Sequence, residues 1–112
     1  MRTGIDIVQI SRIERLMSRY DARFLEKVFT VSEITYANRR RRPAEPLAGR
    51  FAVKEAFMKA VGRRLPWKEI EITMEGQRPT VAYQGDVYEG VSISHEREYA
   101  VAVVVLSGQE AS

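Results

Sequence analysis

Asp6 is the first residue whose type and position could do chemistry. It stands among Ile5, Ile7 and Val8, and a buried carboxylate is costly unless it is paired or binds a metal ion. The alternative is that strand alternation turns Asp6 toward solvent while its apolar neighbours pack. The residues alone therefore leave two roles open for Asp6, a ligand and a surface acid.

Glu55, Lys59 and His95 are the other candidates for chemistry. Glu55 and Lys59 lie four residues apart, on one face of an expected helix. An exposed pair of this kind contributes only about a few tenths of a kcal/mol, but the large apolar side chains around Glu55 favour an inward position. His95, the only histidine, closes an expected strand beside a turn. An imidazole there can donate a hydrogen bond to a phosphate, although a lone histidine is more often structural or exposed.

The elements that must position Asp6 begin with a predicted strand over residues 3–8. Ser11 and Glu14 then have the spacing of a capping box, which predicts the start of a helix. Apolar residues recur along one face of this helix. A separate stripe carries four arginines: Arg12, Arg15, Arg19 and Arg23.

Two further short helices and one long helix are expected before the middle of the chain. Asp21 is the predicted cap of the second helix, and Thr30 with Glu33 repeats the capping-box spacing for the third. The longest predicted helix covers residues 46–61, with a proline in its first turn and Gly62 at its end. This helix carries Glu55 and Lys59.

The second half of the chain is expected to be β-structure, because apolar and polar residues alternate there. Predicted strands lie around residues 70–72 and over residues 80–83, 91–94 and 99–106. The last is a nearly continuous apolar run, which indicates a central strand. The predicted fold class is α+β, with N-terminal helices packed on one small antiparallel sheet that the first strand joins.

Composition fits a single domain over residues 1–112. There is no run of 18 apolar residues, no signal-peptide layout and no cysteine, which together point to the cytoplasm and exclude disulfides and thiol catalysis. Residues 1–64 carry a net charge of +8 and residues 65–112 a net charge of −5, and 14 of the 18 basic residues are arginine. Arginine favours bidentate contacts to phosphate or carboxylate. A polyanionic ligand or an acidic partner is therefore expected, with a solvated basic surface as the alternative.

Three blocks of sequence resemble the signature blocks of the holo-[acyl-carrier-protein] synthases, a family of 4′-phosphopantetheinyl transferases. They are residues 4–7 (GIDI), residues 47–62 (LAGRFAVKEAFMKAVG) and residues 92–95 (SISH). They occur in the family's order at nearly the family's spacing. The resemblance implies the phosphopantetheinyl transferase fold. It also implies an enzyme that transfers 4′-phosphopantetheine from coenzyme A to a serine of apo-acyl-carrier protein, with release of 3′,5′-ADP.

The resemblance also implies roles for the candidate residues. Asp6 and Glu55 match the family's Mg²⁺ ligands, which bring the cation to the coenzyme A pyrophosphate, as suits a hard cation with oxygen ligands. Lys59 matches a basic residue that faces the phosphates, and with the two acids it completes the expected catalytic set. Arg50 and His95 are expected near the nucleotide end of coenzyme A. The proton acceptor remains open between Glu55 and a bound water.

The expected partners follow from the same resemblance. The acceptor is an acidic apo-acyl-carrier protein, and the enzyme is a homotrimer with active sites between subunits. Arg12 and Arg23 match basic positions that the family uses to dock the carrier protein, and the arginine stripe suits an acidic surface. Whether the natural carrier serves fatty-acid or polyketide synthesis is left open.

Two segments depart from the family's pattern. Residues 63–67 follow Gly62 directly, where many relatives have a glycine-rich insertion, so Arg63 and Arg64 are candidates to supply phosphate contacts in its place. Residues 84–90 are shorter and more turn-like than the family's helical connection.

Two other classes of protein compete with the transferase. One is a small basic nucleic-acid-binding module that uses residues 39–42 and the helical arginines. The other is a non-catalytic interaction module. The nucleic-acid-binding alternative leaves Asp6, Glu55 and His95 unexplained.

Overall fold

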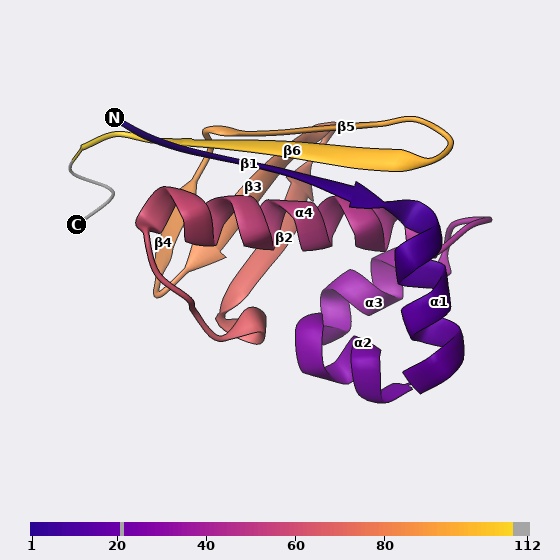
Figure 1. Cartoon of the computed structure of the whole chain (residues 1–112). Helices are drawn as coiled ribbons and strands as arrows, with labels where there is room; N and C mark the ends of the chain where they lie inside the picture. The colour runs from indigo at the N-terminus through magenta and orange to yellow at the C-terminus, as the bar shows by residue number, and fades with distance from the viewer. Residues whose placement is uncertain (21, 109–112) are drawn as a thin grey trace.

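The long helix α4 is the centre of the molecule (Figure 1). The computed structural model describes residues 1–20 and 22–108 and confirms the α+β class. The helices are α1 (Ile10–Tyr20), α2 (Ala22–Val28), α3 (Val31–Asn38) and α4 (Ala44–Val61), followed by a short 3-10 helix η1 (Trp67–Glu69). The strands are β1 (Arg2–Gln9), β2 (Ile70–Glu75), β3 (Arg78–Tyr83), β4 (Asp86–Tyr88), β5 (Val91–His95) and β6 (Tyr99–Leu106). Within the described residues no helix is long and apolar enough to cross a membrane.

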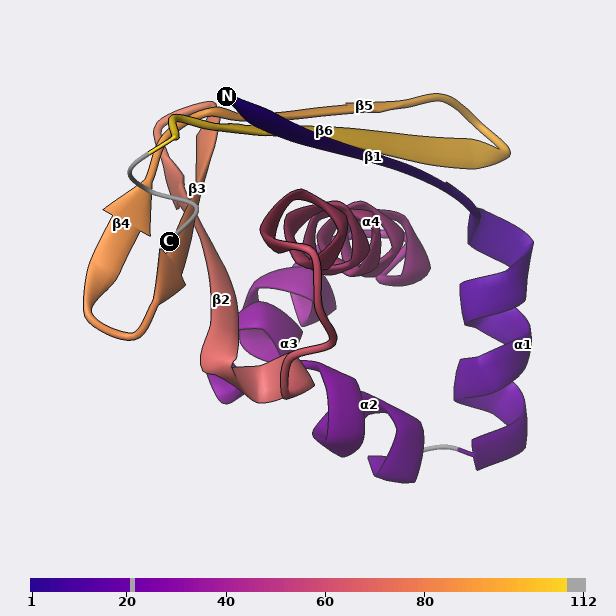
Figure 2. The same cartoon turned by 60° about the vertical axis from the view of Figure 1, so that its left-hand side comes forward.

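The strands form two antiparallel sheets, and the expectation of a single sheet was wrong. One sheet has the order β1-β6-β5 and the other β2-β3-β4. In Figure 2 the first sheet lies over α4 and the second stands beside it. The chain passes between the sheets at Gly90, where a Cβ atom would overlap the carbonyl oxygen of Val105. The apolar run of β6 does form a central strand, as predicted.

Strand β1 lies unusually close to α4, and Gly4 is the reason. A Cβ atom built on Gly4 would overlap the carbonyl oxygen of Ala56, so only glycine fits at this contact. Apolar side chains of both elements are buried, among them Val8 of β1 and Ala52 and Ala60 of α4. The close approach sets the distance between the first strand and the helix that carries the other candidate residues.

The start of α1 differs from its prediction. The helix already begins at Ile10, whose N–H donates to a carbonyl of the β5–β6 turn (2.8 Å). Ser11 therefore lies inside the helix, and the Ser11–Glu14 capping box was wrong. Glu14 instead pairs with Arg42, which follows α3 (3.0 Å). The expected cap at Asp21 lies outside the described residues.

The second capping box is confirmed, and its acid does more than cap a helix. Thr30 N–H donates to Glu33 Oε1 (2.9 Å), and Glu33 N–H donates to Thr30 Oγ1 (3.3 Å). The other oxygen of Glu33 accepts the backbone N–H of Ile72 (2.7 Å). Glu33 thus joins the start of α3 to strand β2.

Glu33 also forms a fully buried ion pair with Lys54 of α4. Lys54 Nζ lies 2.8 Å from Glu33 Oε1, and both side chains have no exposed surface. The same Nζ donates to the carbonyls of Val28 (2.7 Å) and Trp67 (3.0 Å). Burial lowers the pKa of Lys54, and the charge of Glu33 opposes that shift. The three helices α2, α3 and α4 and the short helix η1 therefore meet at a single ammonium group.

We expect Lys54→Met to lower the free energy of unfolding by about 3–5 kcal/mol, because it leaves the buried Glu33 carboxylate without its cation. The double variant Glu33→Gln/Lys54→Met removes both charges and should recover part of that loss. Urea unfolding followed by circular dichroism measures both values. Lys27→Met, at an exposed position of α2, is the matched control. Equal losses in Lys54→Met and Lys27→Met would contradict the assignment.

Candidate functional site

Asp6 faces α4, and its two isoleucine neighbours face outward. Along β1, Gly4 and Val8 are buried while Ile5 and Ile7 are 60% and 62% exposed. The Asp6 side chain, on the same face as Gly4 and Val8, is only 17% exposed. The alternative that Asp6 is a surface acid whose neighbours pack inward was therefore wrong.

Each of the two candidate acids has its own cation. Asp6 Oδ1 accepts a hydrogen bond from Lys59 Nζ (3.2 Å), which also donates to the Ile5 carbonyl (2.9 Å). Glu55 accepts two hydrogen bonds from Arg64, at 3.1 and 3.2 Å. The alternative of an exposed Glu55–Lys59 pair is absent from the ion pairs of the described residues. The inward position of Glu55 is confirmed, since its side chain is only 19% exposed.

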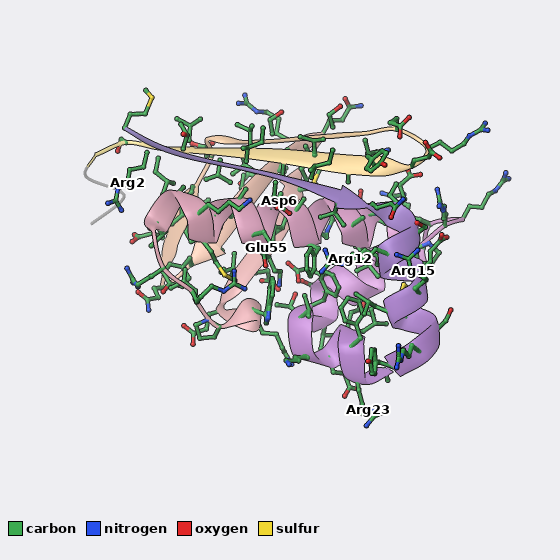
Figure 3. The ribbon with its side chains drawn as sticks, in the orientation of Figure 1. Arg2, Asp6, Arg12, Arg15, Arg23 and Glu55 are labelled. Carbon is green, nitrogen blue, oxygen red and sulfur yellow. The ribbon has the colours of Figure 1, made fainter. Side chains whose placement is uncertain are left out.

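The electrostatics of Asp6 show that the two carboxylates are neighbours. Burial raises the pKa of Asp6 most strongly, the hydrogen bond and charge of Lys59 lower it, and the nearby Glu55 raises it again. Arg12 lowers it from α1. Figure 3 shows Asp6 and Glu55 at the junction of β1 and α4, with Arg12 beside them. The structure thus brings Asp6, Glu55 and Lys59 together as predicted.

This acid pair is a fitting site for a hard divalent cation. Among the described residues there is no group of three or more His, Cys, Asp or Glu side chains that could hold a metal ion. Two carboxylates alone suit Mg²⁺, which keeps several waters and takes the rest of its ligands from a phosphate substrate. The neighbouring cations Lys59 and Arg64 add to the positive charge available to such a substrate.

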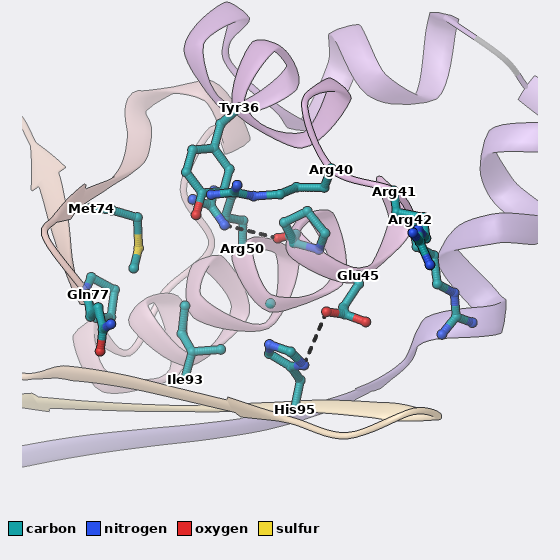
Figure 4. Close-up of a pocket in the computed structure, with 13 residues that line it drawn as sticks. Tyr36, Arg40, Arg41, Arg42, Glu45, Arg50, Met74, Gln77, Ile93 and His95 are labelled. Carbon is teal, nitrogen blue, oxygen red and sulfur yellow. Dashed lines mark hydrogen bonds and ion pairs between the residues drawn. The ribbon is translucent and has the colours of Figure 1, made fainter.

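Arg50 and His95 lie in a separate pocket of about 600 Å³ between α3, α4 and the strands. Figure 4 shows His95 pointing toward Glu45, with Nδ1 3.5 Å from Glu45 Oε1. The other residues that line the pocket are Tyr36, Arg40, Arg41, Arg42, Pro46, Gly49, Arg50, Met74, Gln77, Pro79 and Ile93. Its cationic, partly apolar lining suits an organic anion.

The Arg50 side chain is buried with unused hydrogen-bonding capacity. Its guanidinium lies 4.1 Å from the ring centroid of Tyr36, and its Nε has no hydrogen-bond partner among the described residues. Arg40 covers the same ring at 4.3 Å, and its hydrogen bond lowers the pKa of Tyr36. Tyr36 and Arg40 were not among the predicted site residues, although the run at residues 39–42 was noticed for its charge.

The acid pair and the pocket lie on different faces of α4. Gly49 lines the pocket and Glu55 belongs to the acid pair, and six residues along a helix correspond to about 120° around its axis. Neither Asp6, Glu55 nor Lys59 is among the described residues that line the pocket. Within one chain the structure therefore brings together three of the five predicted catalytic and coenzyme-binding residues and places the other two elsewhere.

The arginines of the first two helices are exposed, as expected for a basic surface. Arg12 lies nearest the acid pair, with its guanidinium 5.6 Å from the ring centroid of Phe51. Figure 3 places Arg12 and Arg15 on α1 and Arg23 on α2. Arg42, from the basic run at residues 39–42, is instead engaged by Glu14 and the Arg97 carbonyl. No specific observation favours the nucleic-acid-binding alternative.

A family model described as the 4′-phosphopantetheinyl transferase superfamily matches residues 2–104. The chain belongs to this superfamily. It is 41% identical over 115 aligned residues to the holo-[acyl-carrier-protein] synthase of Thermus thermophilus, covering 95% of this chain and 92% of that protein. The same enzyme of Chloroherpeton thalassium is also 41% identical, with 95% and 97% covered.

Solved structures of the superfamily agree with the fold. The holo-[acyl-carrier-protein] synthase of Helicobacter pylori, solved in complex with coenzyme A, matches with a TM-score of 0.83 and 32% identity, covering 94% of this chain and 99% of that chain. The predicted phosphopantetheinyl transferase fold and the prediction of an enzyme of the holo-[acyl-carrier-protein] synthase type are confirmed.

Proposed function

We propose that this chain transfers 4′-phosphopantetheine from coenzyme A to a serine of apo-acyl-carrier protein in the cytoplasm, with Mg²⁺ as cofactor and 3′,5′-ADP as the second product. The observation that carries the proposal is the acid pair Asp6–Glu55 with Lys59 beside it. The Thermus relative is a holo-[acyl-carrier-protein] synthase, and the Helicobacter enzyme was solved with coenzyme A.

At the reacting end, Asp6 and Glu55 would hold Mg²⁺, and the cation would supply positive charge to the pyrophosphate as its P–O bond breaks and one of its two phosphates leaves with the nucleotide. Lys59 has a half-exposed side chain, and its ammonium is held by the Ile5 carbonyl and Asp6. It is positioned to contact a phosphate without leaving that anchor. The acceptor serine attacks the β-phosphorus, and the protein contributes mainly alignment and charge.

At the nucleotide end, the pocket beside α3 would bind the anionic adenosine part of coenzyme A. Arg40, Arg41, Arg42, Arg50 and His95 all line it, and a guanidinium can bind a phosphate through two parallel hydrogen bonds. The Nε of Arg50 is buried and has no hydrogen-bond partner among the described residues, so it is an unsatisfied donor beside the pocket. This arrangement supports the roles expected for Arg50 and His95.

Because the acid pair and the pocket lie on different faces of α4, a complete site would use one region from each of two subunits. The outward face of the β1-β6-β5 sheet suits the contact between copies. Ile5 pairs with Val103 and Ile7 with Val101 across the strands, and Val105 extends the apolar surface. An apolar sheet face of this kind marks an interaction site. We propose a homotrimer on these grounds.

We expect Asp6→Ala and Glu55→Ala each to reduce transfer by at least about 100-fold, because either change removes one of two carboxylate ligands. The assay measures 3′,5′-ADP released from coenzyme A in the presence of apo-acyl-carrier protein and Mg²⁺. Thermal unfolding checks that the variants are folded, and Asp86→Ala, at an exposed position of β4, is the control. Near-normal turnover by either variant at saturating Mg²⁺ would refute the metal assignment.

Equal amounts of Asp6→Ala and His95→Ala subunits, unfolded and refolded together, should regain about a quarter of the wild-type rate, because random assembly gives that fraction of sites with both regions intact. Each variant refolded alone should stay inactive. Asp6→Ala mixed with Glu55→Ala is the control, since both acids belong to one region and no mixed site is complete. If the first mixture recovers nothing while its trimers form, the site does not lie between subunits.

Charge reversal at Arg12 or Arg23 should raise the KM for apo-acyl-carrier protein by about tenfold at low salt, because these arginines would attract its acidic surface. The difference should shrink as salt screens the interaction, and the KM for coenzyme A should barely change. Arg78→Glu, an exposed arginine of β3, is the control for net charge. Unchanged carrier-protein KM values in both reversals at low salt would mean that the arginines only keep the surface charged.

A further inference from the structure

Arg64 holds Glu55, one of the two proposed Mg²⁺ ligands, by both carboxylate oxygens. Its Nη1 lies 3.1 Å from Oε2 and its Nη2 3.2 Å from Oε1, a forked pairing. Lys59 pairs with Asp6, the other proposed ligand, through a single hydrogen bond. The two neighbouring carboxylates are thus each neutralised by a separate cation of the protein.

Arg64 can leave Glu55 without a change in the surrounding backbone. The Arg64 side chain is 67% exposed, and an ion pair at such a position is weak and readily exchanged. The backbone on both sides is fixed, since Gly62 ends α4 in a left-handed conformation and Leu65 is buried. Only the side chain of Arg64 would have to move.

Trp67 holds the other side of the Arg64 guanidinium. The guanidinium carbon lies 5.3 Å from the centroid of the Trp67 ring, and that ring stacks on Phe51 at 5.1 Å. A guanidinium is attracted to the face of an indole ring. Trp67 is the only tryptophan of the chain, so its fluorescence reports the position of Arg64.

We propose that Arg64 is a displaceable partner of Glu55, which it neutralises in the metal-free protein and leaves for a phosphate of coenzyme A when a divalent cation binds. The inference rests on the proposed function, because it takes Glu55 as a metal ligand. A guanidinium and a divalent cation repel each other at neighbouring positions on one carboxylate. A guanidinium released there matches the geometry of a phosphate. Arg64 would thereby supply a phosphate contact from the short segment of residues 63–67, where many relatives have a glycine-rich insertion.

The first test measures Mg²⁺ binding by calorimetry without coenzyme A, in the wild type, Arg64→Gln and Arg63→Gln. Arg63 is exposed, and its side chain makes no hydrogen bond or ion pair with the described residues, so Arg63→Gln removes the same charge without the contact. Arg64→Gln should lower the Mg²⁺ Kd about threefold to tenfold relative to Arg63→Gln. If the wild type binds too weakly to measure, Arg64→Gln must gain binding. Equal, weaker or absent binding in Arg64→Gln overturns the inference.

The second test measures coenzyme A binding at saturating Mg²⁺. Here the effect of Arg64→Gln on affinity should be the opposite of its effect on Mg²⁺ binding. Arg64→Gln should bind coenzyme A at least about threefold more weakly than Arg63→Gln, because it lacks a phosphate donor. If Arg64 merely oriented Glu55 for the metal ion, Arg64→Gln would weaken Mg²⁺ binding in the first test instead of strengthening it. If Arg64→Gln and Arg63→Gln bind coenzyme A equally well, Arg64 does not contact a phosphate of coenzyme A.

The fluorescence of Trp67 follows the movement directly. Mg²⁺ should change the emission of the wild type and of Arg63→Gln, and it should leave the emission of Arg64→Gln unchanged. An identical response in all three proteins overturns the inference. The transfer assay with wild-type protein separates the two ideas: without release of 3′,5′-ADP the proposed function fails, whereas normal transfer with unaltered Mg²⁺ binding in Arg64→Gln refutes only the role of Arg64.

Discussion

The buried Lys54–Glu33 ion pair is the interaction on which the rest of the structure depends. Lys54 Nζ binds a carboxylate and two backbone carbonyls, which hold α2, η1 and the start of α3 against α4. Removing two charges from water is costly, so this pair fixes geometry more than it adds net stability. Because Lys54 is locked inward, the next residue, Glu55, turns about 100° around the helix axis toward β1. The anchored Trp67 likewise sets where Arg64 can reach.

The second constraint is the contact of β1 with α4 at Gly4. A side chain there would push the strand away from the Ala56 carbonyl, and Asp6 is carried on the same face two residues later. The distance between the two carboxylates therefore depends on the absence of a Cβ atom. Burial raises the pKa of Asp6, and Lys59 opposes this by holding the carboxylate in its charged form. A strand contact and an ion pair thus combine to keep two acids close together.

Local patterns predicted most of the elements but not which contacts decide their arrangement. The Thr30–Glu33 box and the apolar run of β6 were read correctly because both signals act within a few residues. The Ser11–Glu14 box failed because Glu14 has a partner in Arg42, 28 residues away. The division into two sheets at Gly90 depends on a close contact with β6 that alternation does not encode. Asp6, Glu55 and Lys59 were candidates from residue type and spacing, and resemblance assigned their roles, whereas Tyr36 and Arg40 depend on the packing of α3 over α4.

The use of both faces of α4 explains how a short chain can offer a large site. One face of the helix presents the acid pair with its cations, and another borders a pocket rich in arginine. No rearrangement within one copy is needed if the apolar face of the β1-β6-β5 sheet is covered by another copy. The same contact would then bury Ile5 and Ile7, which stand exposed on either side of Asp6. In that arrangement, assembly would stabilise a small domain and position the second half of its site, so that β1 contributes one side to catalysis and the other to the interface.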